Sequence, residues 1–273
     1  MQFSKLFLRM KDILTKKAIA AIIISLFWTD NSFAVSVKHH FDSTVGIFNA
    51  GGADFTYEVD TAKYAVHSHL YTMGMFDTLY RFIARYATSG RIEKNQMKTE
   101  HYSYEAQSRF SKWSKKVLYS TEGLPLKSIS TKNGKMREKL IKPRDDIGGT
   151  TDLQSVFAAM ARQYLQTGSC KSVRKVFDSK RRYNVIFDDL GVDWLEKDER
   201  SPYFGRALKC SMSIDRLQEE GDDLLWKLSS ESPVYFWIMR DKESNLPFIA
   251  RVKVGKTPLG EMNVYTTEIE VSK

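Results

Sequence analysis

The sequence predicts a mainly β protein in which a curved antiparallel sheet packs against one main α-helix. Three patterns support this prediction. Apolar and polar side chains alternate with a period of two in parts of residues 40–120, one amphipathic pattern of helical period begins near residue 151, and six apolar residues follow one another from Val234 to Met239. Half-buried strands produce the first pattern, and a helix with one buried face produces the second.

The start of the chain is predicted to be a secretion signal. Five basic residues lie within the first 17 positions, the apolar run Ala18–Trp28 follows, and Ser32–Ala34 supplies small residues at the cleavage positions. The run would extend only about 16 Å as a helix, whereas the bilayer core is about 30 Å thick. We therefore expect cleavage between Ala34 and Val35 rather than a membrane anchor, one mature domain of residues 35–273, and a location in the periplasm of a Gram-negative cell.

The charge of the mature chain bears on its partners. Residues 1–34 contain five basic and two acidic residues, so their removal lowers the net charge from +9 to +6. A basic protein suits anionic partners such as phospholipid head groups or lipopolysaccharide, although a solvated basic surface without a specific partner fits equally well. Nucleic acid is not expected, because the chain contains no recognition motif for it. Contact with a membrane is expected to be peripheral at most.

The first half of the mature chain is predicted to be a meander of antiparallel strands. Alternation is clearest in Phe55–Val59 and Tyr64–Leu70, and further aromatic-rich segments follow up to residue 119. Glycines occur between these segments at intervals that are typical of turns, at Gly51, Gly52, Gly74, Gly90 and Gly123.

One amphipathic helix is expected to begin near residue 151. Its apolar stripe recurs at the three-and-four spacing of a helix, in Leu153, Val156, Phe157, Met160 and Tyr164. Thr151 followed by Gln154 fits a capping box, and Gly168 fits a C-terminal stop. A single amphipathic helix among strands has to lay its stripe against a sheet.

The second half of the chain returns to strands, of which Val234–Met239 is apolar on both faces. One face can pack on the helix stripe, and the other must be covered by further strands, a dimer partner or a ligand. Rolling the sheet into a half-barrel would leave room for a ligand. This reasoning predicts a ligand cavity lined by Phe236, Trp237, Phe157 and Met160, with an interior filled by side chains as the alternative.

The two cysteines, Cys170 and Cys210, are expected to form a disulfide. An even count after an export signal favours pairing in an oxidising compartment. Their separation matches no familiar zinc-binding pattern.

Catalysis, a metal ion and a cofactor are not expected. His67 and His69 share a strand face and could chelate a metal, but no pattern of further ligands accompanies them, so exposed strand histidines are the simpler interpretation. No nucleophile–base motif occurs. Carboxylate pairs such as Asp145 and Asp146, or Asp222 and Asp223, are adjacent in sequence and would face opposite ways in a strand.

A basic block offers a candidate contact for an anionic head group. Lys180, Arg181 and Arg182 could bind the anion, with Tyr183 packing beside it. The alternative is a turn after Asp178 whose basic side chains pair with neighbouring carboxylates.

Several blocks resemble the alphaproteobacterial branch of the DUF3108 proteins. The blocks are Gly149–Asp152, Cys170 with Val176–Tyr183, Tyr203–Cys210 and Leu246–Gly260, and the resemblance runs from about residue 40 to 271. The chain has Ser179-Lys180 where the family has Gly-Arg, and Asp152-Leu153 where it has Asp-Pro. The resemblance implies an exported envelope protein of unknown function, with a curved sheet wrapped partly around a helix as in periplasmic lipoprotein carriers.

Two functions remain open at this point. The first is non-enzymatic binding of a lipid, an acylated protein or another hydrophobic ligand in a half-barrel, in maintenance of the cell envelope. The second is an envelope scaffold that binds a protein partner and no small ligand.

Overall fold

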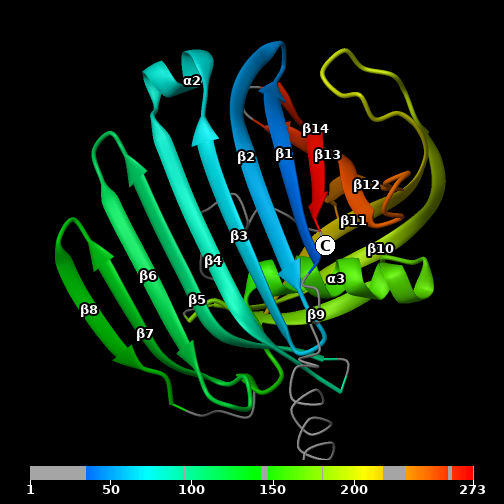
Figure 1. The fold of residues 1–273 in the computed structure, drawn as a ribbon. Helices are drawn as coiled ribbons and strands as arrows, with labels where there is room; N and C mark the ends of the chain where they lie inside the picture. Colours follow the sequence, from blue (N-terminus) through cyan, green and yellow to red (C-terminus); the bar gives the residue numbers. More distant parts are fainter. Residues whose placement is uncertain are drawn as a thin grey trace, which may run out of the picture. The chain divides into compact units, whose positions relative to one another are not determined.

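A computed structural model describes residues 35–94, 96–142, 147–179, 181–217, 231–257 and 260–272 (Figure 1). The predicted signal segment 1–34, the carboxylate pairs at 145–146 and 222–223, and Lys180 lie outside the described residues. Residues Ala34–Lys273 form one compact unit. No helix in the described ranges is long and apolar enough to cross a membrane.

The first half of this unit is the predicted meander of antiparallel strands. Its strands are β1 (Val35–Val45), β2 (Phe48–Val59), β3 (Lys63–Thr72), β4 (Phe82–Glu93), β5 (Gln96–Ser108), β6 (Lys112–Tyr119), β7 (Pro125–Lys132) and β8 (Lys135–Leu140). A short helix that the sequence did not predict, α2 (Gly74–Leu79), connects β3 to β4. Gly74 allows its start, because its φ of 57° lies in the left-handed region.

The second half adds β9 (Ser172–Phe177), β10 (Arg182–Leu195), β11 (Gly205–Arg216), β12 (Val234–Arg240), β13 (Pro247–Thr257) and β14 (Gly260–Ser272). The described strands form a single 14-stranded sheet in the order β8-β7-β6-β5-β4-β3-β2-β1-β14-β13-β12-β11-β10-β9. Every neighbouring pair is antiparallel, and β1 joins β14 at the middle. The sheet is curved and not closed, as the sequence predicted, since β8 and β9 remain edges.

The main helix, α3 (Leu153–Thr167), contacts strands of both halves, including β3 and β5 of the first and β9 and β13 of the second. It ends at Gly168, whose φ of 71° gives the predicted left-handed cap. Its N-cap is Asp152 instead of the predicted Thr151. Thr151 is held instead by backbone hydrogen bonds to Lys175 and Phe177 at the edge of β9.

The carboxylate of Asp152 is buried and accepts five hydrogen bonds. One oxygen, Oδ1, accepts from the backbone N–H groups of Gln154 and Ser155, at 3.0 and 3.1 Å, and from the hydroxyl of Thr88 on β4 at 2.9 Å. The other, Oδ2, accepts from the hydroxyls of Thr99 on β5 and of Ser155, at 2.8 and 2.6 Å. The cap therefore also anchors the helix to the sheet.

The main core lies between α3 and β9–β13. Val156, Met160 and Tyr164 of the helix pack with side chains of the second half, among them Val185, Phe187, Met212, Phe236 and Ile238. The predicted disulfide between Cys170 and Cys210 is present within this core and ties the segment after α3 to β11. Closing a loop of 40 residues stabilises the fold by about 4 kcal/mol in the chain-entropy model.

Both faces of β12 are covered. Val234, Phe236 and Ile238 face the main core, whereas Trp237 packs in a second cluster with Leu195 and Ala207. Tyr203 and Phe248 belong to this second cluster too, with ring centroids 4.8 Å apart. The end of β10 and the segment that leads to β11 therefore cover the face of β12 that points away from the main core.

We predict that Asp152→Ala lowers the free energy of unfolding by about 3 kcal/mol. It removes a helix cap, worth about 1 kcal/mol, and takes one buried acceptor each from the hydroxyls of Thr88 and Thr99, which keep weaker, uncharged partners such as Gln154. Urea denaturation measures the change. Thr151→Ala, at the position predicted from sequence as the cap, is the control and should lower the free energy by about 1 kcal/mol at most. Equal losses in the two variants would contradict this assignment.

A second prediction concerns pH. Burial, together with the neighbouring His40, lowers the pKa of His39 to about 4. Because an unfolded histidine titrates near 6.5, the unfolded chain binds this proton first, and stability falls as the pH is lowered from about 6.5 to 4. His39→Phe, beside Phe41 and Phe248, should reduce that loss by on the order of 2–3 kcal/mol.

Urea denaturation of both proteins at pH 7 and pH 4.5 tests the second prediction. His67→Phe, at an exposed histidine of β3, is the control. If the free energy of unfolding depends on pH in the same way in His39→Phe and in the original chain, the prediction is wrong.

Candidate functional site

The inner face of the sheet is the face that α3 covers. On β3 it carries Tyr64 and Val66, which pack with Ala158 of the helix. It also carries Ser68, whose hydroxyl accepts a hydrogen bond from the side-chain amide of Gln154. Residues that lie directly opposite each other on antiparallel strands share a face. The strand pairings therefore assign the inner face from β1 to β8.

Six of the aromatic side chains on the inner face of β1–β6 form ring pairs away from the helix, and we call them the aromatic wall. They form three ring pairs with centroid separations of 5.7, 4.6 and 6.4 Å: Phe41 with Phe55, Tyr86 with Tyr104, and Phe82 with Trp113. Phe41 is buried, and the other five are half-buried. This wall is an apolar surface that keeps partial access to solvent.

The wall carries no charge at neutral pH. Burial, and the neighbouring Tyr104, raise the pKa of Tyr86 above its usual value, and burial also raises the pKa of Tyr104. Both phenols are therefore neutral. Between the ring pairs lie Ala84 and Ala106, which are only 1% and 4% exposed.

Towards the edge strand β8 the inner face becomes basic. We define the basic edge as Lys132, Lys135, Arg137 and Lys139. Trp113 of the wall lies opposite Lys132, which lies opposite Lys135. All four side chains of the basic edge are exposed, and within the described chain none has an acidic partner.

Exposed apolar side chains gather at one end of the sheet, and we call them the apolar rim. They lie on or next to the connections β1–β2, β3–β4 and β5–β6, which an up-and-down sheet places at the same end (Figure 1). The rim consists of Ile47, Phe48, Met75, Leu79, Tyr80 and Phe110, of which Ile47 is 89% and Phe110 79% exposed. Arg109 ties two of the connections together, since its guanidinium donates to the carbonyl oxygen of Thr78 at 3.3 Å.

A continuous line of rings leads from the rim to the wall. Tyr80 stacks on Phe82 with 6.5 Å between ring centroids, and Phe82 meets Trp113 edge to face. The rim and the wall are therefore parts of one aromatic surface. Sequence reasoning missed this surface, although each of β4, β5 and β6 has two aromatic residues an even number of positions apart, which was a signal for it.

The four residues predicted to line a ligand cavity do not share one space. Phe157, Met160 and Phe236 belong to the main core, where Phe157 and Phe236 both contact Phe187 with 5.9 Å between ring centroids. Trp237 points to the opposite face of β12, where its indole N–H donates to Asp193 at 3.0 Å. The alternation of side chains along a strand separates positions 236 and 237.

The residues predicted to contact an anion are also divided. Arg181 pairs with Asp178 inside its own turn, with 2.7 Å between Nη2 and Oδ2. Tyr183 is 1% exposed and lies in the main core. Arg182 and Tyr183 are adjacent in β10 and so face opposite ways. The turn contacts the first half of the sheet, because Lys115 of β6 donates to the carbonyl oxygen of Asp178.

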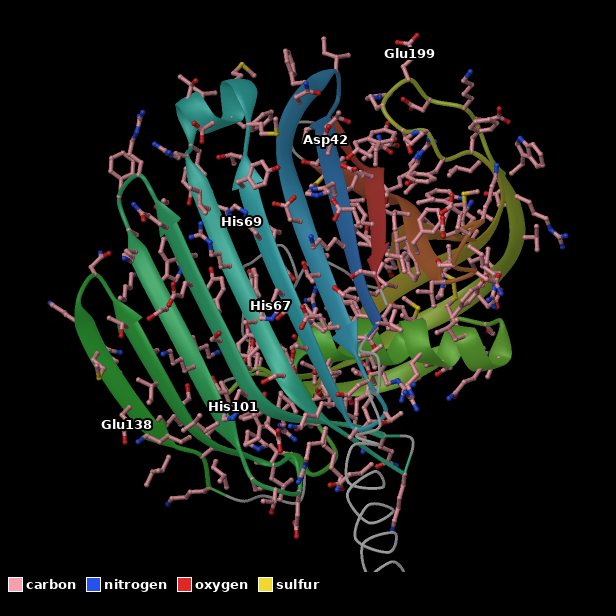
Figure 2. All side chains as sticks on the ribbon, viewed as in Figure 1. Asp42, His67, His69, His101, Glu138 and Glu199 are labelled. Carbon is pink, nitrogen blue, oxygen red and sulfur yellow. A yellow bond between two sulfur atoms is a disulfide. The ribbon has the colours of Figure 1, made fainter. Side chains whose placement is uncertain are left out.

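The histidines considered for a metal, His67 and His69, both lie on the outer face of β3 (Figure 2). They border an open depression of about 280 Å³ over β2–β5, which Arg85 and Glu105 also line. His69 Nδ1 lies 3.3 Å from Asp54, and His67 is exposed. This depression is open and lies on the outer face, unlike the enclosed cavity expected from the sequence.

Comparisons with known proteins agree with this architecture. The fold is similar to that of a beta-barrel-like protein of domain of unknown function DUF1849 from Brucella abortus, with a TM-score of 0.51 and 9% identity over 88% of this chain and 98% of that chain. A MucA/MucB complex of Pseudomonas aeruginosa aligns over 88% of this chain and 94% of that chain at 11% identity, but its TM-score of 0.14 supports no argument. None of the curated proteins matches the sequence.

A family model covers most of the chain. The model described as a protein of unknown function, DUF3108, matches residues 36–263, a span that runs from β1 into β14 and contains both halves of the sheet with α3. It distinguishes no branch within the family. The chain belongs to the DUF3108 family.

Proposed function

We propose that this protein binds an anionic amphiphile, a lipid with an acyl tail and a negatively charged head group, and that it catalyses no reaction. The observation that carries the proposal is the change along the inner face from aromatic side chains on β1–β6 to basic side chains on β7 and β8. An amphiphile likewise has an apolar tail next to a charged head group. We place this activity in the periplasm, on the strength of the secretion signal predicted from the sequence.

The rows of the sheet show how such a ligand would lie. One row contains Phe55, Tyr86 and Tyr104 on β2, β4 and β5. It continues through Lys115 on β6 and Ser130 on β7 to Arg137 on β8. Transfer of each CH₂ group from water to an apolar surface contributes about 0.8 kcal/mol, so an acyl chain gains most along the wall. A phosphate or carboxylate gains charge-assisted hydrogen bonds at the basic edge.

The apolar rim gives such a protein a way to meet a membrane. Exposed apolar clusters on soluble proteins mark contact surfaces, and here basic residues, Arg81, Arg109 and Lys112, accompany them. A surface that combines apolar and basic side chains suits the interface of an anionic bilayer. The rim continues into the aromatic wall, so a lipid would pass from the bilayer onto the wall without crossing a polar surface.

Lipid extraction and native mass spectrometry of the purified protein test the proposal, followed by displacement of a bound hydrophobic fluorescent probe by phosphatidylglycerol. We expect bound lipid and a displacement that Trp113→Ala weakens about tenfold, which corresponds to about 1.4 kcal/mol. Trp194→Ala, at an exposed tryptophan of β10, is the matched control. A ligand-free protein that captures an envelope protein would favour the scaffold and contradict lipid binding.

The head-group part of the proposal has its own prediction. The double variant Lys132→Glu/Arg137→Glu should bind phosphatidylglycerol about tenfold or more weakly, because two favourable charges become unfavourable, and should bind a neutral diacylglycerol as before. The matched control Lys171→Glu/Lys175→Glu reverses two exposed charges outside the basic edge. Equal loss for the charged and the neutral lipid would show that the basic edge does not bind the head group.

A further inference from the structure

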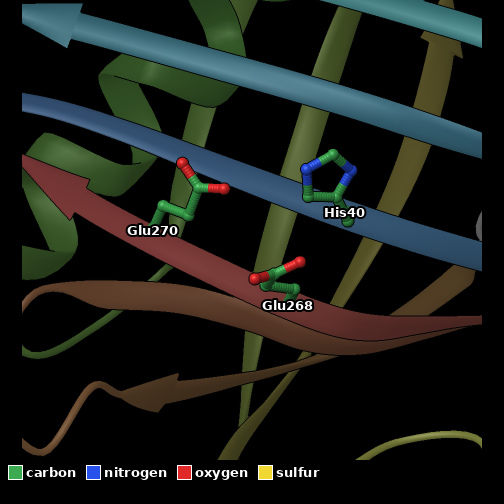
Figure 3. Close-up of side chains that lie close together, drawn as sticks. All are labelled: His40, Glu268 and Glu270. Carbon is green, nitrogen blue, oxygen red and sulfur yellow. The ribbon is translucent and has the colours of Figure 1, made fainter.

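We propose that the outer face carries a binding site for one divalent transition-metal ion, formed by His40 on β1 and by Glu268 and Glu270 on β14 (Figure 3). Each of the three side chains offers one ligand atom, and these atoms all lie within 4.8 Å of one another. The site is independent of the amphiphile surface, because it lies on the opposite face of the sheet.

The pairing of β1 with β14 brings the three ligands together. His40 lies directly opposite Glu268, and Lys38, two residues earlier on β1, lies opposite Glu270. Side chains two apart on a strand share a face, so both carboxylates project on the side of the His40 ring. The register shifts between His40 and Phe41, and irregularities of this kind commonly redirect side chains near functional sites.

A fourth residue, Asp54 on β2, orients the imidazole. Its Oδ1 lies 2.6 Å from Nδ1 of His40, while its Oδ2 lies 3.3 Å from Nδ1 of His69. A carboxylate at this distance accepts the Nδ1–H of a neutral imidazole and leaves the lone pair on Nε2. Metal-binding histidines are commonly held by such a carboxylate on the nitrogen that does not bind the metal. Asp54 is not itself one of the three proposed ligands, so it supports the site independently.

The three ligand atoms favour one class of metal ion. One imidazole nitrogen and two carboxylate oxygens suit Zn²⁺ and its neighbours in the transition series, whereas Mg²⁺ and Ca²⁺ prefer oxygen ligands alone. Zinc binds these atoms at about 2.0–2.2 Å, so the ligand atoms need to move only slightly closer. The side chains of His40 and Glu270 are 41% and 51% exposed, which leaves them free to rotate and leaves water to complete the coordination.

One nearby charge opposes the ion. The ammonium group of Lys38 lies 3.2 Å from Oε2 of Glu270 and pairs with it. A cation at the site has to compete with this ion pair. The geometry therefore makes two opposite predictions for neighbouring residues: removal of Lys38 strengthens metal binding, and removal of Asp54 weakens it.

Titration of the purified protein without a histidine tag with Zn²⁺, followed by isothermal calorimetry, tests the site. We expect one ion per chain. His40→Ala and Glu268→Gln should each weaken binding at least tenfold, Asp54→Asn should weaken it by about 10- to 100-fold, and Lys38→Met should strengthen it. His67→Ala, another histidine of the outer face, is the matched control and should leave the affinity unchanged.

The thermal unfolding of each variant with a chelator present shows whether it is folded, so that a loss of binding can be assigned to the site. Zn²⁺ should raise the unfolding temperature of the original chain and not that of His40→Ala. Absence of Zn²⁺ binding, or binding that survives His40→Ala with unchanged affinity, would overturn the proposal. If Zn²⁺ binding is lost in His67→Ala instead, the ion is bound at the depression over β2–β5 and the proposed site is wrong.

Discussion

The buried carboxylate of Asp152 connects three parts of the protein that lie far apart in the sequence: the start of α3, β4 and β5. A buried carboxylate without hydrogen bonds is costly, so this group requires all of its partners at once. The helix can therefore dock in one place, at one end of the first half of the sheet. That placement leaves the remaining inner surface of β1–β6 to aromatic side chains, and it lets the apolar stripe of α3 fill the space against β9–β13. The disulfide between Cys170 and Cys210 then secures the segment that leaves the helix.

The register of the strands divides the molecule into two chemically different surfaces. The inner face passes from rings to lysine and arginine, whereas the outer face carries histidine and carboxylate side chains in cross-strand rows. One outer row runs from Glu268 through His40, Asp54 and His69 to Arg85. A shift of one residue in any strand would exchange the two faces of that strand and mix these surfaces. The proposed lipid surface and the proposed metal site are thus separate consequences of one pattern of pairing.

Local patterns predicted much of the secondary structure, and the differences have simple causes. The capping box at Thr151 failed because Asp152, one residue later, offers a carboxylate that reaches two backbone N–H groups and two threonines of the sheet. The ligand cavity was placed at Phe236 and Trp237 because both faces of an apolar strand need a cover. The sequence could not show that the segment after β10 returns to supply that cover. The rings of the aromatic wall are spread from β1 to β6, and only the pairing of these strands brings them together.

The sequence by itself determined the mainly β class, the antiparallel meander, the position and C-terminal end of the main helix, and the pairing of the two cysteines. These features depend on local periodicity, on the conformational freedom of glycine at 168, and on an even cysteine count. Only the tertiary structure decided which residues share a surface. His40 meets Glu268 and Glu270 because the first and last strands of the chain pair. Trp113 meets Lys132 and Lys135 because three successive hairpin strands align in register. Contacts of this kind depend on register and curvature, which no single segment of the sequence contains.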